Sequence, residues 1–186
     1  MKILIIGANG EIGKRLVLGL EDKHEIITAG RSTGDIKVDI SSKESIKDMF
    51  NLVTNIDACV CVAGDSYTGS LDSLDEEKLN VGIKNKLVAQ ANLVLIGKNY
   101  INDKGSFTLT SGKMGDKPGV NAVGKAIANG GVNSFALAAG LEMPRGITIN
   151  AVSPSKVSNI SDEDLINGYL KSIEGNTNGE IIKINY

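Results

Sequence analysis

Three glycines near the start of the chain have the spacing of a phosphate-binding loop: Gly7, Gly10 and Gly13. They follow the apolar run Ile3–Ile6 and precede a segment with apolar residues at helical spacing. Gly7 allows a tight turn, Gly10 lets the backbone approach a pyrophosphate, and Gly13 lets helix and strand pack closely. Free N–H groups and the helix dipole then attract the phosphates. The sequence therefore predicts a dinucleotide at Gly7, Asn9, Gly10, Glu11, Ile12 and Gly13.

A second turn bears on which dinucleotide the chain prefers. Arg31 and Ser32 follow the second expected strand, and no acid occurs between them and Asp35. A carboxylate at this turn usually binds the ribose 2′-hydroxyl of NAD, whereas an arginine accommodates the 2′-phosphate of NADP. A guanidinium and a hydroxyl can both make charge-assisted hydrogen bonds to that phosphate. We therefore expect NADP as the cofactor, with NAD less favoured.

The composition excludes several other kinds of chemistry. His24 is the only histidine, which rules out a histidine-based triad and a multi-histidine metal site. Cys59 and Cys61 alternate in an apolar strand, as small core residues do, so no metal site is expected. A net charge of −2, the absence of tryptophan and an aromatic content of 4% argue against nucleic-acid binding. No apolar run approaches a membrane span, and we expect a cytoplasmic protein with a small-molecule substrate.

These residues must be positioned by strands and helices that alternate along all 186 residues. The alternation predicts a single α/β domain, residues 1–186, with a doubly wound parallel sheet and helices on both faces. Ligands of such sheets bind at the carboxyl ends of the strands. The expected strands are Ile3–Ile6, Glu25–Ala29, Ile36–Val38, Asp57–Ala63, Gly105–Thr110, Gly146–Val152 and Glu180–Ile184. After the helix that follows the glycine loop, the expected helices are Ser41–Val53, Leu74–Tyr100, Val120–Met143 and Ser161–Ile173.

Several motifs, taken together in their order along the chain, resemble those of the short-chain dehydrogenases/reductases. Gly7–Gly13 is similar to the family's GxxGxxG motif, and Val38–Ile40 to the segment whose acid contacts adenine. Val62–Gly64 stands where the family has an Asn-Asn-Ala-Gly turn, with both asparagines missing. Pro144–Pro154 is similar to the segment that enters the nicotinamide loop, and Asn176–Ile181 to the start of the terminal strand. The resemblance implies a Rossmann-type sheet of strand order 3-2-1-4-5-6-7, and adds Asp39, Ile40, Ala63, Gly64 and Pro154 to the cofactor site.

The active-site residues of that family have no complete counterpart in this chain. The resemblance places Ser111 at the serine position and Lys84 near the asparagine of the preceding long helix. The family's tyrosine and lysine correspond either to Asn121 and Lys125 or to Lys125 and Asn129. We prefer the second register, because it needs no insertion in the helix. Neither register supplies a tyrosine.

Two functions follow from the resemblance and its gaps. The first is an NADP(H)-dependent oxidoreductase for a small carbonyl compound or alcohol, in which Ser111 binds the oxygen, Lys125 acts as the acid, and Lys84 and Asn129 complete the site. The second is an NADP(H)-binding sensor or partner subunit that is catalytically weak or inactive. We favour the oxidoreductase, and Tyr67 is the tyrosine expected to lie nearest the cleft. Only Ser155–Ile160 separates Pro154 from the last helix, so we expect an open or partner-completed substrate site.

The resemblance also implies an oligomer. In the family, the two long central helices often pair across a two-fold axis. Here Leu74–Tyr100 carries Leu87, Ala91 and Leu95 beyond its core-facing stripe, and Ala126–Gly140 is rich in small residues that allow close approach. We therefore expect a homodimer or homotetramer built on these helices.

Overall fold

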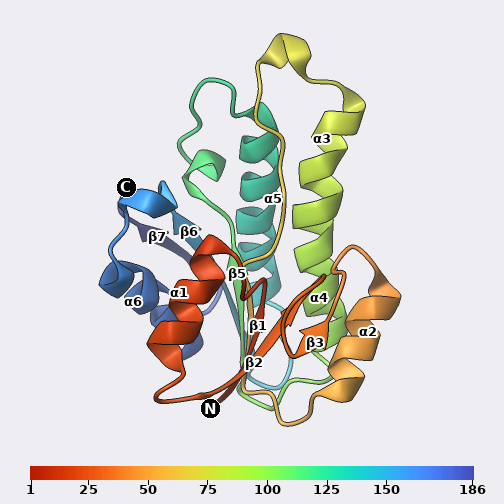
Figure 1. The fold of residues 1–186 in the computed structure, drawn as a ribbon, viewed down its shortest axis with the longest axis vertical. Coiled ribbons are helices and arrows are strands. Elements are labelled where there is room, and N and C mark those ends of the chain that lie inside the picture. Colours follow the sequence, from red (N-terminus) through yellow and green to blue (C-terminus); the bar gives the residue numbers. More distant parts are fainter.

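A parallel sheet of seven strands forms the centre of the protein, in a computed structural model that describes all residues from Met1 to Tyr186 (Figure 1). The strand order is β3-β2-β1-β4-β5-β6-β7, which confirms the predicted Rossmann-type topology. Every neighbouring pair is parallel, so the carboxyl ends of all strands lie at one edge. The strands are β1 (Lys2–Ile6), β2 (Glu25–Gly30), β3 (Ile36–Lys37), β4 (Ala58–Cys61), β5 (Ser106–Thr110), β6 (Thr148–Pro154) and β7 (Ile181–Ile184).

Two hydrophobic cores cover the two faces of this sheet, because strand side chains alternate between them. Leu4 and Ile6 of β1 enter the larger core, whereas Ile3 and Ile5 enter the smaller one. The larger core packs against α2 (Lys43–Leu52), α4 (Ala89–Gly97) and α5 (Val123–Gly140). The smaller core packs against α1 (Glu11–Leu20) and α6 (Asp162–Ile173). Helices therefore lie on both faces, as the sequence pattern predicts.

The long helix expected at Leu74–Tyr100 is interrupted by a change of hydrogen-bond register. It begins as α3 (Glu76–Gly82), where the Asp75 side chain accepts a bond of 2.8 Å from the Lys78 amide. A π-helical turn covers Ile83–Val88 before the chain continues as α4. Single π-helical turns inside α-helices are frequent at functional sites. The apolar spacing predicts the helix but not this turn.

The second long helix is shorter at both ends than the sequence indicates. It was expected over Val120–Met143, yet α5 begins at Val123 and ends at Gly140. Asn121 has a φ of 62°, a left-handed conformation that cannot belong to a right-handed helix, so the start is delayed. As a result, Asn121 lies outside the helix, while Lys125 and Asn129 lie within it.

Hydroxyl groups join α6 to the neighbouring strand β5. Ser106, Thr108 and Thr110 alternate along β5 and so face the same helix. The Thr108 hydroxyl lies 2.7 Å from that of Ser172, and the Thr110 hydroxyl lies 2.8 Å from that of Tyr169. Burial raises the pKa of Tyr169, so this phenol is a structural hydrogen-bonding group.

Candidate active site at the carboxyl edge of the sheet

The glycine loop forms the first part of the site. A Cβ atom on Gly13 would lie 2.3 Å from the Gly7 carbonyl oxygen, so only glycine allows this approach of helix and loop. No side chain caps the start of α1 at Gly10, and the first helical bond runs from the Lys14 amide to the Gly10 carbonyl. The three amides before Lys14 therefore donate to no protein acceptor. Such free amides at a helix start suit a pyrophosphate.

The turn after β2 forms the second part. The Arg31 side chain is 75% exposed, and its guanidinium lies 3.9 Å from the Asp39 carboxylate. Asp35 instead accepts hydrogen bonds from the amide and hydroxyl of Thr28, at 2.9 and 2.7 Å, and these bonds lower the pKa of Asp35. The only acid of this turn thus folds the turn itself and is not free to bind a ribose hydroxyl.

A contact between Asn9 and Thr33 joins this turn to the glycine loop, with a distance of 2.8 Å from amide nitrogen to hydroxyl oxygen. Both residues line a pocket of about 430 Å³ that also includes Lys14. Nearby, the Asp39 carboxylate accepts bonds from the hydroxyl and the amide of Ser41, which lower the pKa of Asp39. Ser32 is exposed and Ile40 is buried beside this segment.

A buried side chain separates the carboxyl ends of β4 and β5. Gln90 is fully buried, and its amide nitrogen donates to the carbonyl oxygens of Ala63 and Thr110, at 3.3 and 3.0 Å. Its amide oxygen accepts from the Thr110 amide at 3.0 Å. Beyond these bonds the two strands no longer pair with each other. Doubly wound sheets bind ligands where the strand order reverses, which in this sheet is between β1 and β4, one strand away from this gap.

Lys86 lies on the π-helical turn, close to the carboxyl end of β5. Its ammonium donates a hydrogen bond of 2.9 Å to the Ser111 carbonyl oxygen. A Cβ on Gly64 would lie 2.8 Å from the Cγ of Lys86, so the glycine of this turn makes room for the lysine. Burial lowers the pKa of Lys86 to about 8; the Cys61 thiol opposes this shift, and the charge of Lys125 adds to it. The group can therefore exchange a proton near neutral pH.

Ser111 and Asn129 complete the site from β5 and α5. Ser111 is buried, and its hydroxyl donates to the Val152 carbonyl at 3.4 Å, a long bond that a better acceptor can replace. Asn129 is buried against Gly112, and its amide oxygen has no hydrogen-bond partner. A buried acceptor without a partner is uncommon, and a hydroxyl donor from a bound molecule would satisfy it.

One lysine of the expected cleft does not lie where the sequence indicates. Lys84, expected near the asparagine position, is exposed, and Lys86 contacts Ser111 instead. The π-helical turn explains the difference, because it alters the angular spacing of side chains after Gly82. Lys125 is half-buried within electrostatic reach of Lys86. Pro154 ends β6 and is buried.

The tyrosines also differ from expectation. The Tyr67 hydroxyl lies 3.1 Å from that of Ser73, in the loop before α3, and makes no contact with Ser111. Tyr186 also lies at the carboxyl edge, and its hydroxyl lies 2.6 Å from that of Ser153 near the end of β6. Local sequence patterns carry no signal for this contact, because it depends on the pairing of β7 with β6.

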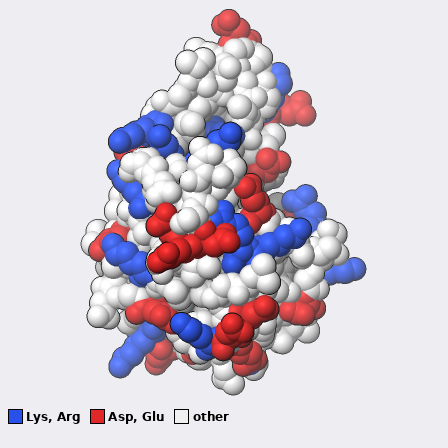
Figure 2. Space-filling view, turned by 60° about the vertical axis from the view of Figure 1, so that its left-hand side comes forward, with Lys and Arg blue, Asp and Glu red and all other residues white.

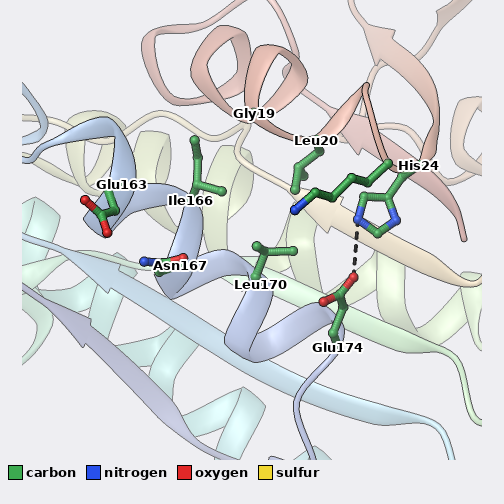
Figure 3. A pocket seen from close by; sticks show the side chains of 9 residues that line it. Gly19, Leu20, His24, Glu163, Ile166, Asn167, Leu170 and Glu174 are labelled. Atoms are coloured by element: carbon green, nitrogen blue, oxygen red, sulfur yellow. Dashed lines mark ion pairs between the residues drawn. The ribbon is translucent and has the colours of Figure 1, made fainter.

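The single histidine lies elsewhere. His24 forms an ion pair with Glu174, with Nε2 3.2 Å from the carboxylate oxygen (Figure 3). Both line a pocket of about 280 Å³ between the carboxyl end of α1 and one side of α6, together with Gly19, Leu20, Ile166 and Leu170. The carboxyl ends of both helices lie opposite the glycine loop, since the helices return from the ligand-binding edge.

No helix in the protein has the length and apolar character needed to cross a membrane.

Several solved structures share this fold. The protein lin1944 from Listeria innocua is 42% identical, with 100% of both chains covered and a TM-score of 0.94. A small-chain dehydrogenase is 25% identical over 99% of this chain and 96% of its own, with a TM-score of 0.87. A small-chain dehydrogenase in complex with NADPH is 22% identical over 100% and 96%, with a TM-score of 0.88. Neither a family model nor a curated protein matches the chain.

The fold is thus that of the short-chain dehydrogenases/reductases. At 42% identity over its full length, the chain belongs to the same family as the lin1944 protein.

Proposed function

We propose that the protein is an NADP(H)-dependent oxidoreductase that acts on a small carbonyl compound or alcohol. One observation carries the proposal. The uncapped start of α1 and the group formed by Lys86, Ser111 and Lys125 lie at the same carboxyl edge of the sheet. A dinucleotide along this edge would extend from the glycine loop toward this group.

The residues present suit NADP. The free amides before Lys14 would hold the pyrophosphate, while Arg31 and Ser32 would hold the 2′-phosphate without opposition from Asp35. The unpartnered oxygen of Asn129 would accept a ribose hydroxyl. The bound cofactor would supply the hydride. That a structural neighbour is a small-chain dehydrogenase in complex with NADPH supports this choice.

The chain would supply oxygen binding and the proton. The Ser111 hydroxyl can turn from the Val152 carbonyl to the substrate oxygen, because its present bond of 3.4 Å is long. Lys125 stands near the start of α5 and would give a proton to that oxygen during reduction. Lys86, which donates a hydrogen bond to the Ser111 carbonyl oxygen, would be a second group in the site that can exchange protons near neutral pH.

A second function is favoured by one feature of α5. In the register that we prefer, Lys125 and Asn129 take the positions where the resemblance expects a tyrosine and a lysine, and no tyrosine lies on this helix. An NADP(H)-binding sensor or partner subunit would need the nucleotide site but not the proton donor. Turnover separates the two functions, since only the oxidoreductase consumes NADPH.

The test begins with calorimetric titration of NADP and NAD into the protein. Small aldehydes, ketones and alcohols are then screened by the change in NADPH absorbance. Tighter binding of NADP together with turnover that Lys125→Met abolishes would support the oxidoreductase. NADP binding without turnover of any compound would favour the sensor, and absence of nucleotide binding would overturn both functions.

We also propose that the protein forms a homodimer or homotetramer through α4 and α5. Leu87 packs inside the chain against Gly131, so it does not belong to the outer surface. The outer surface of these helices instead exposes Leu95 and Leu137, which are 52% and 44% exposed. Val88 and Ile127 are also exposed, at 44% and 42%.

A further inference from the structure

Three lysines surround one tyrosine ring at the carboxyl edge of the sheet. The ammonium groups of Lys113, Lys117 and Lys183 lie 5.6, 5.7 and 5.6 Å from the centre of the Tyr186 ring. Lys113 belongs to the short 3₁₀ turn that follows β5, and Lys183 belongs to β7. Segments far apart in the sequence thus bring three positive charges together. We call these three lysines the lysine cluster.

The lysine cluster lies beside Ser111. Thr110 of β5 pairs with Val152 of β6, so Ser111 and Ser153 are the next pair, on strands about 4.8 Å apart. Both side chains fall on the face covered by α5, because Leu109 and Ala151 two residues earlier enter the core on that face. Ser153 is fully buried, and its hydroxyl lies 2.6 Å from that of Tyr186. The ring therefore holds the lysines next to the residue that would bind the substrate oxygen.

The charges of the lysine cluster are only partly neutralised. Lys183 forms an ion pair with Asp116, which raises the pKa of Lys183. Lys113 and Lys117 have no carboxylate within ion-pair distance. Figure 2 shows basic side chains on the left of this view, above a band in which acidic and basic side chains lie together. The protein as a whole carries a net charge of −2, so the positive charge is local.

We propose that the lysine cluster binds an anionic group of the substrate, a carboxylate or a phosphate, next to the reacting carbonyl. The inference rests on the proposed oxidoreductase function and names its substrate class. The aromatic ring positions the ammonium groups through cation–π contacts but does not neutralise them. An oxyanion within reach of Lys113 and Lys117 would accept charge-assisted hydrogen bonds from their ammonium groups.

The test is an NMR titration of the isotope-labelled protein with malonate and, separately, with inorganic phosphate. Each titration is made without NADP and again with saturating NADP, which fills the nucleotide phosphate sites. The proposal predicts saturable shifts of the amide signals of residues 111–117 and 183–186 under both conditions. The anion with the lower dissociation constant identifies the substrate group as a carboxylate or a phosphate. Neutral malonamide should produce no saturable shift.

The variant Lys113→Met/Lys117→Met keeps most of both side-chain stems and removes the two unpaired charges. It should raise the dissociation constant of the preferred anion about tenfold or more. Lys47→Met is the control, because Lys47 is exposed on α2, at the opposite edge of the sheet from β7. The control should bind the anion like the wild-type protein. Absence of saturable shifts at these residues, or equal binding by the double variant, overturns the proposal.

These measurements are independent of turnover and of nucleotide binding. Anion binding without NADP binding would therefore count against the proposed function and leave the anion site in place. If turnover is found, 2-oxo acids should be reduced with a lower KM than the neutral ketones of the same length, and the double variant should remove that difference.

Discussion

The ammonium of Lys86 donates a hydrogen bond of 2.9 Å to the carbonyl oxygen of Ser111. This bond joins the π-helical turn to Ser111 after β5, and it holds a partly buried cation beside the residue expected to bind the substrate oxygen. Burial in this position lowers the pKa of Lys86 to about 8 from 10.5, the usual value of a lysine. Because the π-helical turn sets the direction of the Lys86 side chain, the geometry of this helix determines where the proton-exchanging ammonium lies.

The first prediction concerns the pH dependence of stability. Between about pH 8 and 10.5 the unfolded chain binds more protons at Lys86 than the folded protein, so stability rises with pH through this window. Urea unfolding of wild type and Lys86→Met should show this difference. We expect the free energy of unfolding of wild type to gain up to about 3 kcal/mol relative to the variant across the window. Lys84→Met, at an exposed site, should follow wild type, and parallel curves for all three proteins would contradict the assignment.

The second prediction concerns Lys125. Lys125→Met retains much of the side-chain packing but removes the charge and the proton. If Lys125 gives the proton to the substrate oxygen, turnover should fall about a hundredfold or more, with NADP binding weakened much less. Lys84→Met serves as the matched control, because it removes an exposed lysine from the neighbouring helix. Full turnover in Lys125→Met would eliminate this role.

The third prediction concerns the choice of nucleotide. Arg31→Ala should weaken NADP binding about tenfold to a hundredfold, since a charge-assisted hydrogen bond to the 2′-phosphate is lost. NAD lacks that phosphate, so its dissociation constant should change little. Isothermal titration with both nucleotides measures the difference, and Lys37→Ala at the nearby exposed end of β3 is the control. Equal losses for NADP and NAD would show that Arg31 does not read the 2′-phosphate.

The fourth prediction concerns assembly. Light scattering at micromolar concentration should give the mass of a dimer or tetramer, and Leu137→Glu should shift the protein toward the monomer because it places a charge in the apolar surface of α4 and α5. Leu18→Glu is the control, since Leu18 is 71% exposed on α1, which covers the other face of the sheet. A monomer mass for the wild-type protein would remove the proposed interface.

Sequence periodicity predicted most of the fold, because each element carries its own local signal. The apolar run of β1, the glycine loop and the alternation of strands with helices determine a doubly wound sheet, and the structure has the predicted strand order. The start of α5 was wrong because Asn121 adopts a left-handed conformation that apolar spacing does not indicate. The π-helical turn at Ile83–Val88 was missed for a related reason, since it changes hydrogen-bond register without changing residue types.

The residues of the candidate site also differ in whether local or long-range contacts position them. Gly13 and Arg31 could be proposed from the sequence because a strand and a turn position them within a few residues. Lys86 was missed because its direction depends on the π-helical turn, and Tyr186 because its contact with Ser153 depends on long-range pairing of β6 with β7. Residues placed by non-local contacts have no signature in a single sequence.

The Gln90 side chain has a further consequence for binding. Since it satisfies the amide of Thr110 and the carbonyls of Ala63 and Thr110, the two strands are already apart before any molecule enters. A ligand at this edge meets a preorganised floor and need not break backbone pairing to reach it. The free energy of binding can then serve to orient the ligand. Substitutions around the site can also change its chemistry without altering the backbone pairing of the sheet.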